Sequence, residues 1–224
     1  MSASSLTLTL REDFGALIKE HAQGVSQVSG LELAEFKQLN DRMADLSTAF
    51  AAAIGSAVAD LPDGRTMLAK EYEALSKIAD KLGLPEQRLL SKVQFAGLNV
   101  ENINLAYLGI RDVEYLRCLD ICPELKCLYL ANNRIEDLEP LAGLSTLQGL
   151  YIHHNQVTDI TPLANLASLT ELYLYSNPIS DLTPLHALAN LNHLWLDGVA
   201  ALSDESQAWL NRFQAHGGIV DLHS

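Results

Sequence analysis

Apolar positions recur at a fixed step of 22 residues through the second half of the chain. Each copy opens on a leucine and has leucine or isoleucine three and five positions later. The four clear copies open at Leu125, Leu147, Leu169 and Leu191. A constant period of this length is typical of a solenoid, in which each repeat buries its apolar side against the next. The alternation of inward leucines and outward residues predicts a short β-strand at the start of each copy.

Polar and turn-forming residues follow each predicted strand at fixed positions. Three copies have an asparagine eight residues after the opening leucine, an aspartate after twelve and a proline after fifteen. These residues are Asn133, Asn155 and Asn177, then Asp137, Asp159 and Asp181, then Pro140, Pro162 and Pro184. An asparagine side chain can bond the backbone groups that a turn leaves unpaired, so stacked copies would form a ladder. The proline fixes the returning segment and removes one backbone donor.

The same step predicts a degenerate copy before the four clear ones, opening at Ile103. Ala106 and Leu108 stand at its strand-leucine positions, Arg111 replaces the asparagine and Cys118 replaces the proline. In the last copy Val199 stands at the asparagine position. We therefore expect five copies within residues 96–202, of which the first and last are degenerate, as terminal repeats commonly are.

The segments on both sides of the repeats have a helical pattern. We expect helices over residues 12–28, 29–60 and 66–82, a turn over residues 61–64, and a short helix that begins at Pro85. Residues 1–95 are thus predicted to be an α-helical domain, which either caps the solenoid or acts independently. A helix from Ser203 to about Gln214 and a strand over residues 219–222 would make residues 203–224 a cap on the last repeat.

The segment LKCLYLANNRIEDLEPLAGLST, residues 125–146, resembles the 22-residue leucine-rich repeat of bacterial internalins and of the similar eukaryotic phosphatase-regulator subclass. The resemblance extends over roughly residues 103–212. It implies an α/β solenoid with short parallel strands on a concave face, between the amino-terminal helices and the helix–strand cap. It also implies a protein-binding module whose sheet receives the partner. The chain differs from the internalins in showing no export signal or wall-anchor motif and in its longer amino-terminal helices.

The chain is acidic, with 15 Lys and Arg against 28 Asp and Glu and a formal net charge of −13. Residues 96–224 contain 5 basic and 15 acidic residues, so most of the excess lies there. A negative surface repels phosphate backbones and anionic lipid, so we expect neither a nucleic-acid nor a membrane ligand. A protein partner with a basic face is the natural expectation.

The cysteines and the amino terminus favour a cytoplasmic location. Cys118, Cys122 and Cys127 do not have the spacing of a zinc site, and Cys122 falls on a core position of the repeat. Free thiols suit a reducing compartment. The first ten residues lack the pattern of a secretory signal, and no apolar run is long enough to cross a bilayer. A dedicated secretion machine that reads this Ser/Thr-rich start is the alternative.

The outward strand positions contain the candidate site. The position between the two strand leucines is aromatic in all five predicted copies: Tyr107, Tyr129, Tyr151, Tyr173 and Trp195. Because neighbouring strands lie about 4.8 Å apart, these rings should form a continuous stripe. Two positions earlier stand Leu105, Cys127, Gly149, Glu171 and His193, and two positions later Gly109, Ala131, His153, Tyr175 and Asp197. We predict a partner-binding surface made of the aromatic column and a rim of Tyr175, His153, Glu171, His193 and Asp197.

Other chemistry is conceivable at this surface. His153, His154 and His193 near Glu171 suggest a metal site, and Cys127 with His153 suggests a nucleophile and its base. Nothing in the pattern orients the histidine or supplies oxyanion donors, so we expect no enzyme, no catalytic residue, no metal and no cofactor.

Three functions therefore remain open. We predict a non-enzymatic module that binds a protein on the concave face, with a monomer favoured over an oligomer. The alternatives are a bacterial effector, whose repeats recognise a host target after delivery into another cell, and a structural protein that associates with itself through the aromatic column. The rings could also serve only to stabilise the sheet, or be covered by the amino-terminal helices, because cross-strand aromatic pairs are stabilising by themselves.

Overall fold

A computed structural model describes residues 58–61, 65–196 and 202–222. The chain divides into two compact units, residues 1–72 and 73–224. The helix expected over residues 12–28, and the expected helix from residue 29 as far as residue 57, lie outside the described residues. In the part of the chain that is described, no helix has the length and apolarity that crossing a bilayer requires.

The described part of the first unit contains a small hairpin where the sequence pattern predicts helix. Strand β1 (Val58–Asp60) pairs antiparallel with β2 (Thr66–Leu68), and helix α3 (Ala69–Leu82) begins directly afterwards. The expectations of a helix that continues to residue 60 and of one that begins at Thr66 are therefore wrong at these ends. The Leu61 N–H donates to the Arg65 carbonyl at 2.8 Å and closes the connection. The β-branched Val58 and Thr66 suit the paired strands better than a helix.

Two helical segments precede the repeats in the second unit, as the sequence predicts. Helix α3 ends at Leu82, where Gly83 takes a left-handed φ of 62°, and α4 (Glu86–Leu90) follows Pro85. Their inward side chains are almost fully buried: Ala74, Leu75, Ile78, Ala79, Leu89 and Leu90. They contribute to the core at the amino-terminal end of the solenoid.

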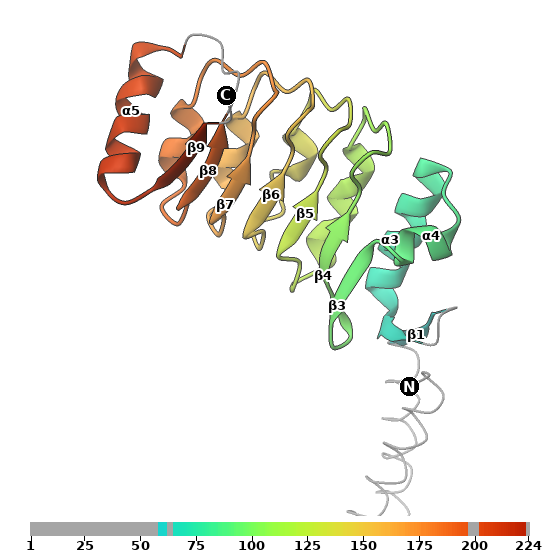
Figure 1. Cartoon of the computed structure of the whole chain (residues 1–224). Coiled ribbons are helices and arrows are strands. Elements are labelled where there is room, and N and C mark those ends of the chain that lie inside the picture. The colour runs from blue at the N-terminus through green and yellow to red at the C-terminus, as the bar shows by residue number, and fades with distance from the viewer. Residues whose placement is uncertain (1–57, 62–64, 197–201, 223–224) are drawn as a thin grey trace, which may run out of the picture. The chain divides into compact units, whose positions relative to one another are not determined.

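A seven-stranded sheet runs through the repeats (Figure 1). Its strands, in chain order and in spatial order, are β3 (Val93–Ala96), β4 (Asn99–Asn104), β5 (Cys127–Tyr129), β6 (Gly149–Tyr151), β7 (Glu171–Tyr173), β8 (His193–Leu196) and β9 (Ile219–Leu222). All neighbours from β4 to β9 are parallel, which confirms the expected solenoid. Strand β3, which the pattern does not predict, is antiparallel to β4 and covers its open edge.

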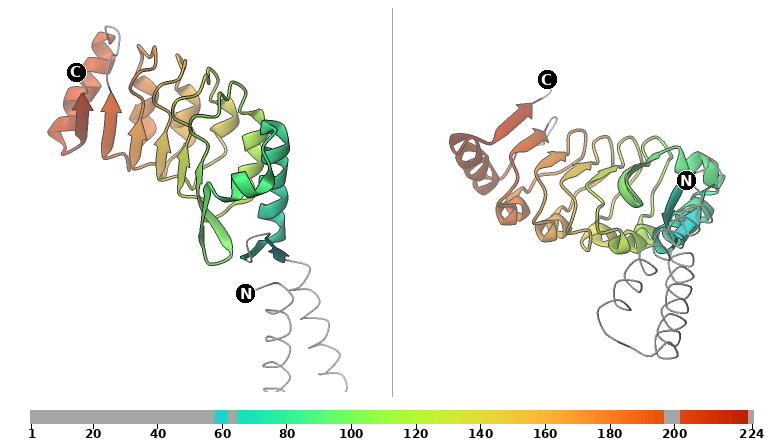
Figure 2. Two further views of the ribbon diagram at one scale, coloured as in Figure 1. Left: turned by 45° about the vertical axis from the view of Figure 1, so that its right-hand side comes forward. Right: turned by 90° about the horizontal axis from the view of Figure 1, so that it is seen from below.

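Short 3-10 helices return the chain on the other side of the sheet (Figure 2). They are η1 (Glu114–Ile121), η2 (Glu139–Leu141), η3 (Thr161–Asn165) and η4 (Thr183–Ala187). The repeated prolines stand in the first turn of η2, η3 and η4, where a missing N–H is not needed. The repeat leucines fill the space between strands and helices and are at most 6% exposed.

The asparagines form the expected ladder inside the solenoid. The Asn155 amide nitrogen donates to the carbonyls of Leu130 (3.0 Å) and Ile152 (2.9 Å), so it joins two successive repeats. Its oxygen accepts the N–H of Ile135 at 3.0 Å. Asn133 and Asn177 repeat the arrangement, and all three are at most 8% exposed. The ladder satisfies backbone groups that would otherwise be buried without partners.

The repeated aspartates begin the return segments. Asp137, Asp159 and Asp181 each accept the backbone N–H two residues later, at 2.8 to 2.9 Å. The same bond joins Asp112 to the Glu114 N–H at 2.8 Å. Asp112 lies 25 residues before Asp137, so the first copy does not follow the 22-residue step.

The strand register confirms that the first copy is longer. Ile103 pairs with Leu128 and not with Leu125, so the step from β4 to β5 is 25 residues, whereas the later steps are 22. Helix η1 has eight residues and η2 has three, which locates the extra length in the first return segment. The assignment of Ile103 as the opening residue is therefore wrong. In this copy Leu108 and Tyr115, and not Arg111 and Cys118, stand at the asparagine and proline positions.

The carboxyl-terminal cap has the predicted helix and strand. Helix α5 (Asp204–Ala215) is capped by Ser203, whose Oγ accepts the Ser206 N–H at 3.2 Å, and β9 pairs with β8. The Ser206 Oγ in turn donates to Asp181 at 3.2 Å and accepts the Leu182 N–H at 2.8 Å. Ser206 is fully buried, so these bonds join α5 to the last aspartate turn.

Candidate protein-binding surface

Four rings form one continuous stack on the outward face of the sheet. The register aligns Tyr129, Tyr151, Tyr173 and Trp195 on neighbouring strands. Successive ring centroids lie 4.3, 4.5 and 3.9 Å apart, with interplanar angles of 12°, 30° and 7°. Each of the four residues is half-buried. The predicted stripe is confirmed for these four residues, which we call the aromatic column.

Tyr107 does not belong to the aromatic column, which corrects the fifth predicted member. The residue aligned with Tyr129 on β4 is Asn104, because the first copy is three residues longer than the others. Tyr107 instead has a left-handed φ of 61° beyond the strand, like Asn132, His154 and Ser176 in later copies, and is 77% exposed. At the other end Asp221 aligns with Trp195. The column is therefore bounded by an amide and a carboxylate.

The outward positions before the rings are Asn102, Cys127, Gly149, Glu171, His193 and Ile219. Leu105, expected there, is fully buried, which follows from the same shift of register. Gly149 leaves room for the ring of Tyr151, because a Cβ at residue 149 would lie 3.1 Å from both Tyr151 Cε2 and Cys127 Sγ. The Tyr151 hydroxyl donates to Glu171 Oε2 at 2.9 Å. Burial, and then this carboxylate, raise the pKa of Tyr151.

The outward positions after the rings contain a second, shorter stack. His153 lies parallel to Tyr175, with centroids 4.3 Å apart, and 6.1 Å from Tyr173. Burial, with a smaller effect of His154, lowers the pKa of His153, so the stacked ring is neutral at pH 7. Gly109, expected in this row, has a left-handed φ of 68° in the turn after β4. Asp197 lies outside the described residues.

The histidines and Cys127 of this surface were also candidates for metal binding and nucleophilic chemistry. Among the described residues, no three His, Cys, Asp or Glu side chains are placed to hold a metal ion. Burial, and then Glu171, raise the pKa of Cys127, which favours the protonated thiol over the thiolate that a nucleophile requires.

The structure adds a pocket that the repeat pattern does not reveal. A hollow of about 680 Å³ lies at the Tyr129 end of the aromatic column. It is lined by Arg88, Ser91, Lys92, Gln94, Asn102, Asn104 and Tyr129. Arg88 lies on the short helix that the sequence predicts after Pro85, and Lys92 follows this helix. Their position beside Tyr129, the first ring of the column, is evident only from the fold.

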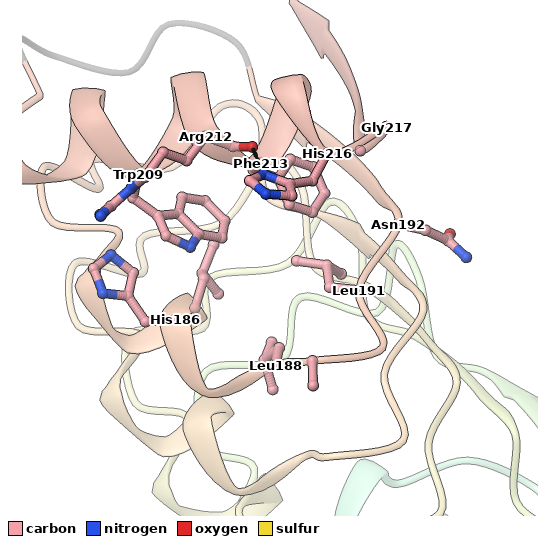
Figure 3. A pocket seen from close by; sticks show the side chains of 12 residues that line it. His186, Leu188, Leu191, Asn192, Trp209, Arg212, Phe213, His216 and Gly217 are labelled. Atoms are coloured by element: carbon pink, nitrogen blue, oxygen red, sulfur yellow. Dashed lines mark hydrogen bonds between the residues drawn. The ribbon is translucent and has the colours of Figure 1, made fainter.

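A second hollow, of about 340 Å³, lies between η4 and α5 (Figure 3). Trp209 stacks between His186 and Phe213, with centroids 5.5 and 5.2 Å away. Leu188 and Leu191 are buried beneath them. The rings of α5 thus cover the leucines of the last return segment, which matches the expected capping role of this helix.

Comparisons with known proteins agree with the repeat geometry. Residues 123–165 and 145–185 match the family model for leucine-rich repeats in two copies. No curated protein matches the chain significantly. Among solved structures, the chain is similar to internalin C2 of Listeria monocytogenes, with 40% identity and a TM-score of 0.48, over 55% of this chain and 52% of that one.

The chain is also similar to two other solved structures that contain leucine-rich repeats. A leucine-rich-repeat protein of Leptospira interrogans is 20% identical with a TM-score of 0.45, over 54% of this chain and 36% of that one. The leucine-rich-repeat ectodomain of the receptor kinase SOBIR1 from Arabidopsis thaliana is 19% identical with a TM-score of 0.52, over 70% of this chain and 93% of that one. This last similarity shows the fold alone. The chain spans about half the length of the internalin structure that it matches.

Proposed function

We propose that the chain, a leucine-rich-repeat protein, binds another protein on the outward face of its sheet. The observation that carries the proposal is the stack of Tyr129, Tyr151, Tyr173 and Trp195, whose half-buried rings form an ordered amphipathic surface. Tyrosine and tryptophan give a large contact area at a low cost in conformational entropy, and they are enriched where proteins bind each other. We assign binding to the repeats, residues 96–202, and capping to residues 203–224.

Polar side chains on both sides of the column supply the rim of the proposed interface. Glu171 is held by the Tyr151 hydroxyl, and His153 is held against Tyr175, so both are ordered before any partner arrives. Pre-ordered groups lose less entropy on binding, which increases affinity. The net charge of −13 favours a partner that is basic over most of its contact area. The reduced cysteines are consistent with a cytoplasmic site of action.

Affinity capture with matched variants tests the proposal. Tyr151→Ala combined with Tyr173→Ala removes the centre of the column, whereas Tyr107→Ala removes an exposed tyrosine outside it. Wild type and Tyr107→Ala should retain the same protein from an extract of the source cells, and the double variant should lose it. Circular dichroism must show that all three are folded.

Light scattering distinguishes binding to a different protein from self-association. A wild-type monomer that captures a partner through the column supports the proposal. A wild-type dimer that dissociates in the double variant assigns the column to self-association instead. Equal capture by wild type and the double variant contradicts the proposed surface.

A further inference from the structure

The pocket at the Tyr129 end of the aromatic column differs in charge from the rest of the chain. Arg88 and Lys92 line it, and Tyr129, the first ring of the column, forms part of its wall. Among the described residues, neither cation forms an ion pair. Lys77, Arg117 and Lys126 each contact a carboxylate at 2.7 to 2.8 Å, whereas other cations of the described residues also lack an ion pair. Arg88 and Lys92 are distinguished by lining the same pocket. Two cations with no carboxylate partner in the described part of the chain therefore lie together at one end of the proposed surface, in a chain with a net charge of −13.

The amides of the pocket add hydrogen-bond donors to the cations. The Asn102 side chain donates to Gln94 Oε1 at 2.7 Å, which leaves the Gln94 amide nitrogen as the group available to a ligand. Asn104 Oδ1 accepts the Ala106 N–H at 3.1 Å, which likewise leaves its amide nitrogen available. A set of N–H donors around two cations is complementary to a group that only accepts hydrogen bonds. An ionised carboxylate is such a group, and its bonds to charged donors are about twice as strong as neutral ones.

The opposite end of the column has the opposite charge. Asp221 aligns with Trp195, the last ring, whereas Glu171, which accepts from the Tyr151 hydroxyl, lies beside the middle of the column. A partner segment lying along the rings therefore meets donors and cations at Tyr129, then the Glu171 carboxylate beside Tyr151, and finally the Asp221 carboxylate beyond Trp195. Such a gradient fixes the direction in which the segment lies, because the reversed orientation places like charges together.

We infer that the pocket binds an Asp or Glu side chain at one end of an extended partner segment, whose remaining residues lie on the aromatic column. The inference rests on the proposed function and specifies its partner: a peptide segment with a carboxylate at one end and basic residues at the other. It also refines the expectation of a uniformly basic partner, since one acidic contact is required at the Tyr129 end.

Selection from a library of random peptides displayed on phage tests the inference with the full chain as bait. The pocket variant is Arg88→Gln combined with Lys92→Gln. The control, Lys77→Gln combined with Arg117→Gln, lowers the net charge equally but changes exposed ion pairs outside the pocket lining. Wild type and control should select peptides with an acidic residue near one end. Synthetic copies of those peptides should bind the pocket variant about tenfold more weakly.

A charge exchange gives a second, independent readout. Arg88→Glu combined with Lys92→Glu should bind better to the same peptides after their acidic residue is replaced by lysine. A variant that only disturbs the fold cannot show this gain. Equal binding of the original peptides by wild type and the pocket variant overturns the inference.

The column variant Tyr151→Ala with Tyr173→Ala separates failure of the inference from failure of the proposed function. Peptides that lose binding to the column variant but not to the pocket variant leave the function standing and refute the pocket. If the selected peptides bind the column variant as tightly as wild type, the proposed function and the inference are both refuted. The same holds if wild type enriches no peptide more strongly than the column variant does.

Discussion

The asparagine ladder and the aromatic column recur with the same 22-residue step but lie in opposite environments. Asn133, Asn155 and Asn177 are at most 8% exposed, and each bonds backbone groups of two repeats. The rings of the column are half-buried and contact mainly one another across the strands. Regular spacing alone therefore does not distinguish a structural residue from a binding residue. We propose that the environment does, because a buried amide must be satisfied whereas a partly exposed outward ring remains available to a partner.

The largest effect should come from breaking the ladder. Asn155→Ala leaves the Ile135 N–H without its side-chain partner in the interior. It also removes one of the two amide donors of the Leu130 and Ile152 carbonyls, which keep Asn133 and Asn177 respectively. We expect the free energy of unfolding to fall by about 2–4 kcal/mol, since an unsatisfied buried N–H costs about 1–3 kcal/mol and each further lost hydrogen bond about 1 kcal/mol. Urea denaturation followed by circular dichroism measures the loss. As a control, Asn190→Ala removes an exposed bond to the Ala167 carbonyl and should cost much less. Equal losses would contradict the structural role of the ladder.

A smaller loss should follow removal of one ring from the middle of the column. Tyr151 stacks on Tyr129 and on Tyr173, so Tyr151→Ala removes two ring contacts, whereas Tyr129→Ala removes one. Stacked pairs contribute about 0.5–1.5 kcal/mol each, so we expect losses of about 1–2 and about 1 kcal/mol. The same urea titration compares the two variants. A loss at Tyr151 that reaches the value for Asn155→Ala would make the column structural and would erase the contrast with the ladder.

The free energy of unfolding should depend on pH because of His153, which lies beside the aromatic column. Its lowered pKa means that the unfolded chain binds a proton more readily than the folded chain. The free energy of unfolding should therefore decrease as the pH falls below about 6.5, by less than about 1 kcal/mol because the ring is partly solvated. The pKa values of Asp159 and Asp181 are also lowered, so these carboxylates reduce the stability only below about pH 4. They therefore do not contribute to a change near pH 6.5.

Comparison of wild type with His153→Gln isolates this contribution. The variant cannot take up the proton, so its unfolding free energy should change less between pH 7.5 and pH 5.5. Thermal or urea unfolding at several pH values provides the measurement. Parallel profiles for the two proteins would show that His153 is not held neutral by the fold.

The smallest effect is expected at Tyr107, which looks like a column residue in the sequence. Tyr107→Gly replaces an exposed side chain at a φ of 61°, which glycine adopts without strain. The free energy of unfolding should change by no more than about 0.5 kcal/mol, because surface substitutions rarely exceed that. Partner or peptide binding should be unchanged. A clear loss of binding would place Tyr107 in the recognition surface despite its position outside the column.

The sequence by itself determined the repeats, because buried leucines, turn asparagines and prolines are local requirements that recur in every copy. It therefore predicted the parallel strands, the asparagine ladder, the cap formed by α5 and β9, and four of the five column residues. It also predicted Glu171, His153, Tyr175 and His193 as neighbours of the rings, since their positions follow from the strand register.

Only the tertiary structure decided where the first copy begins. Helix η1 absorbs three more residues than a fixed step allows, so Asn104 aligns with the rings and Tyr107 enters a turn. The hairpin strands β1, β2 and β3 and the pocket with Arg88 and Lys92 also depend on pairing between segments that show no shared period. Periodicity indicates which residues a copy must bury, whereas the pairing between strands selects the register, because one face of the sheet is buried.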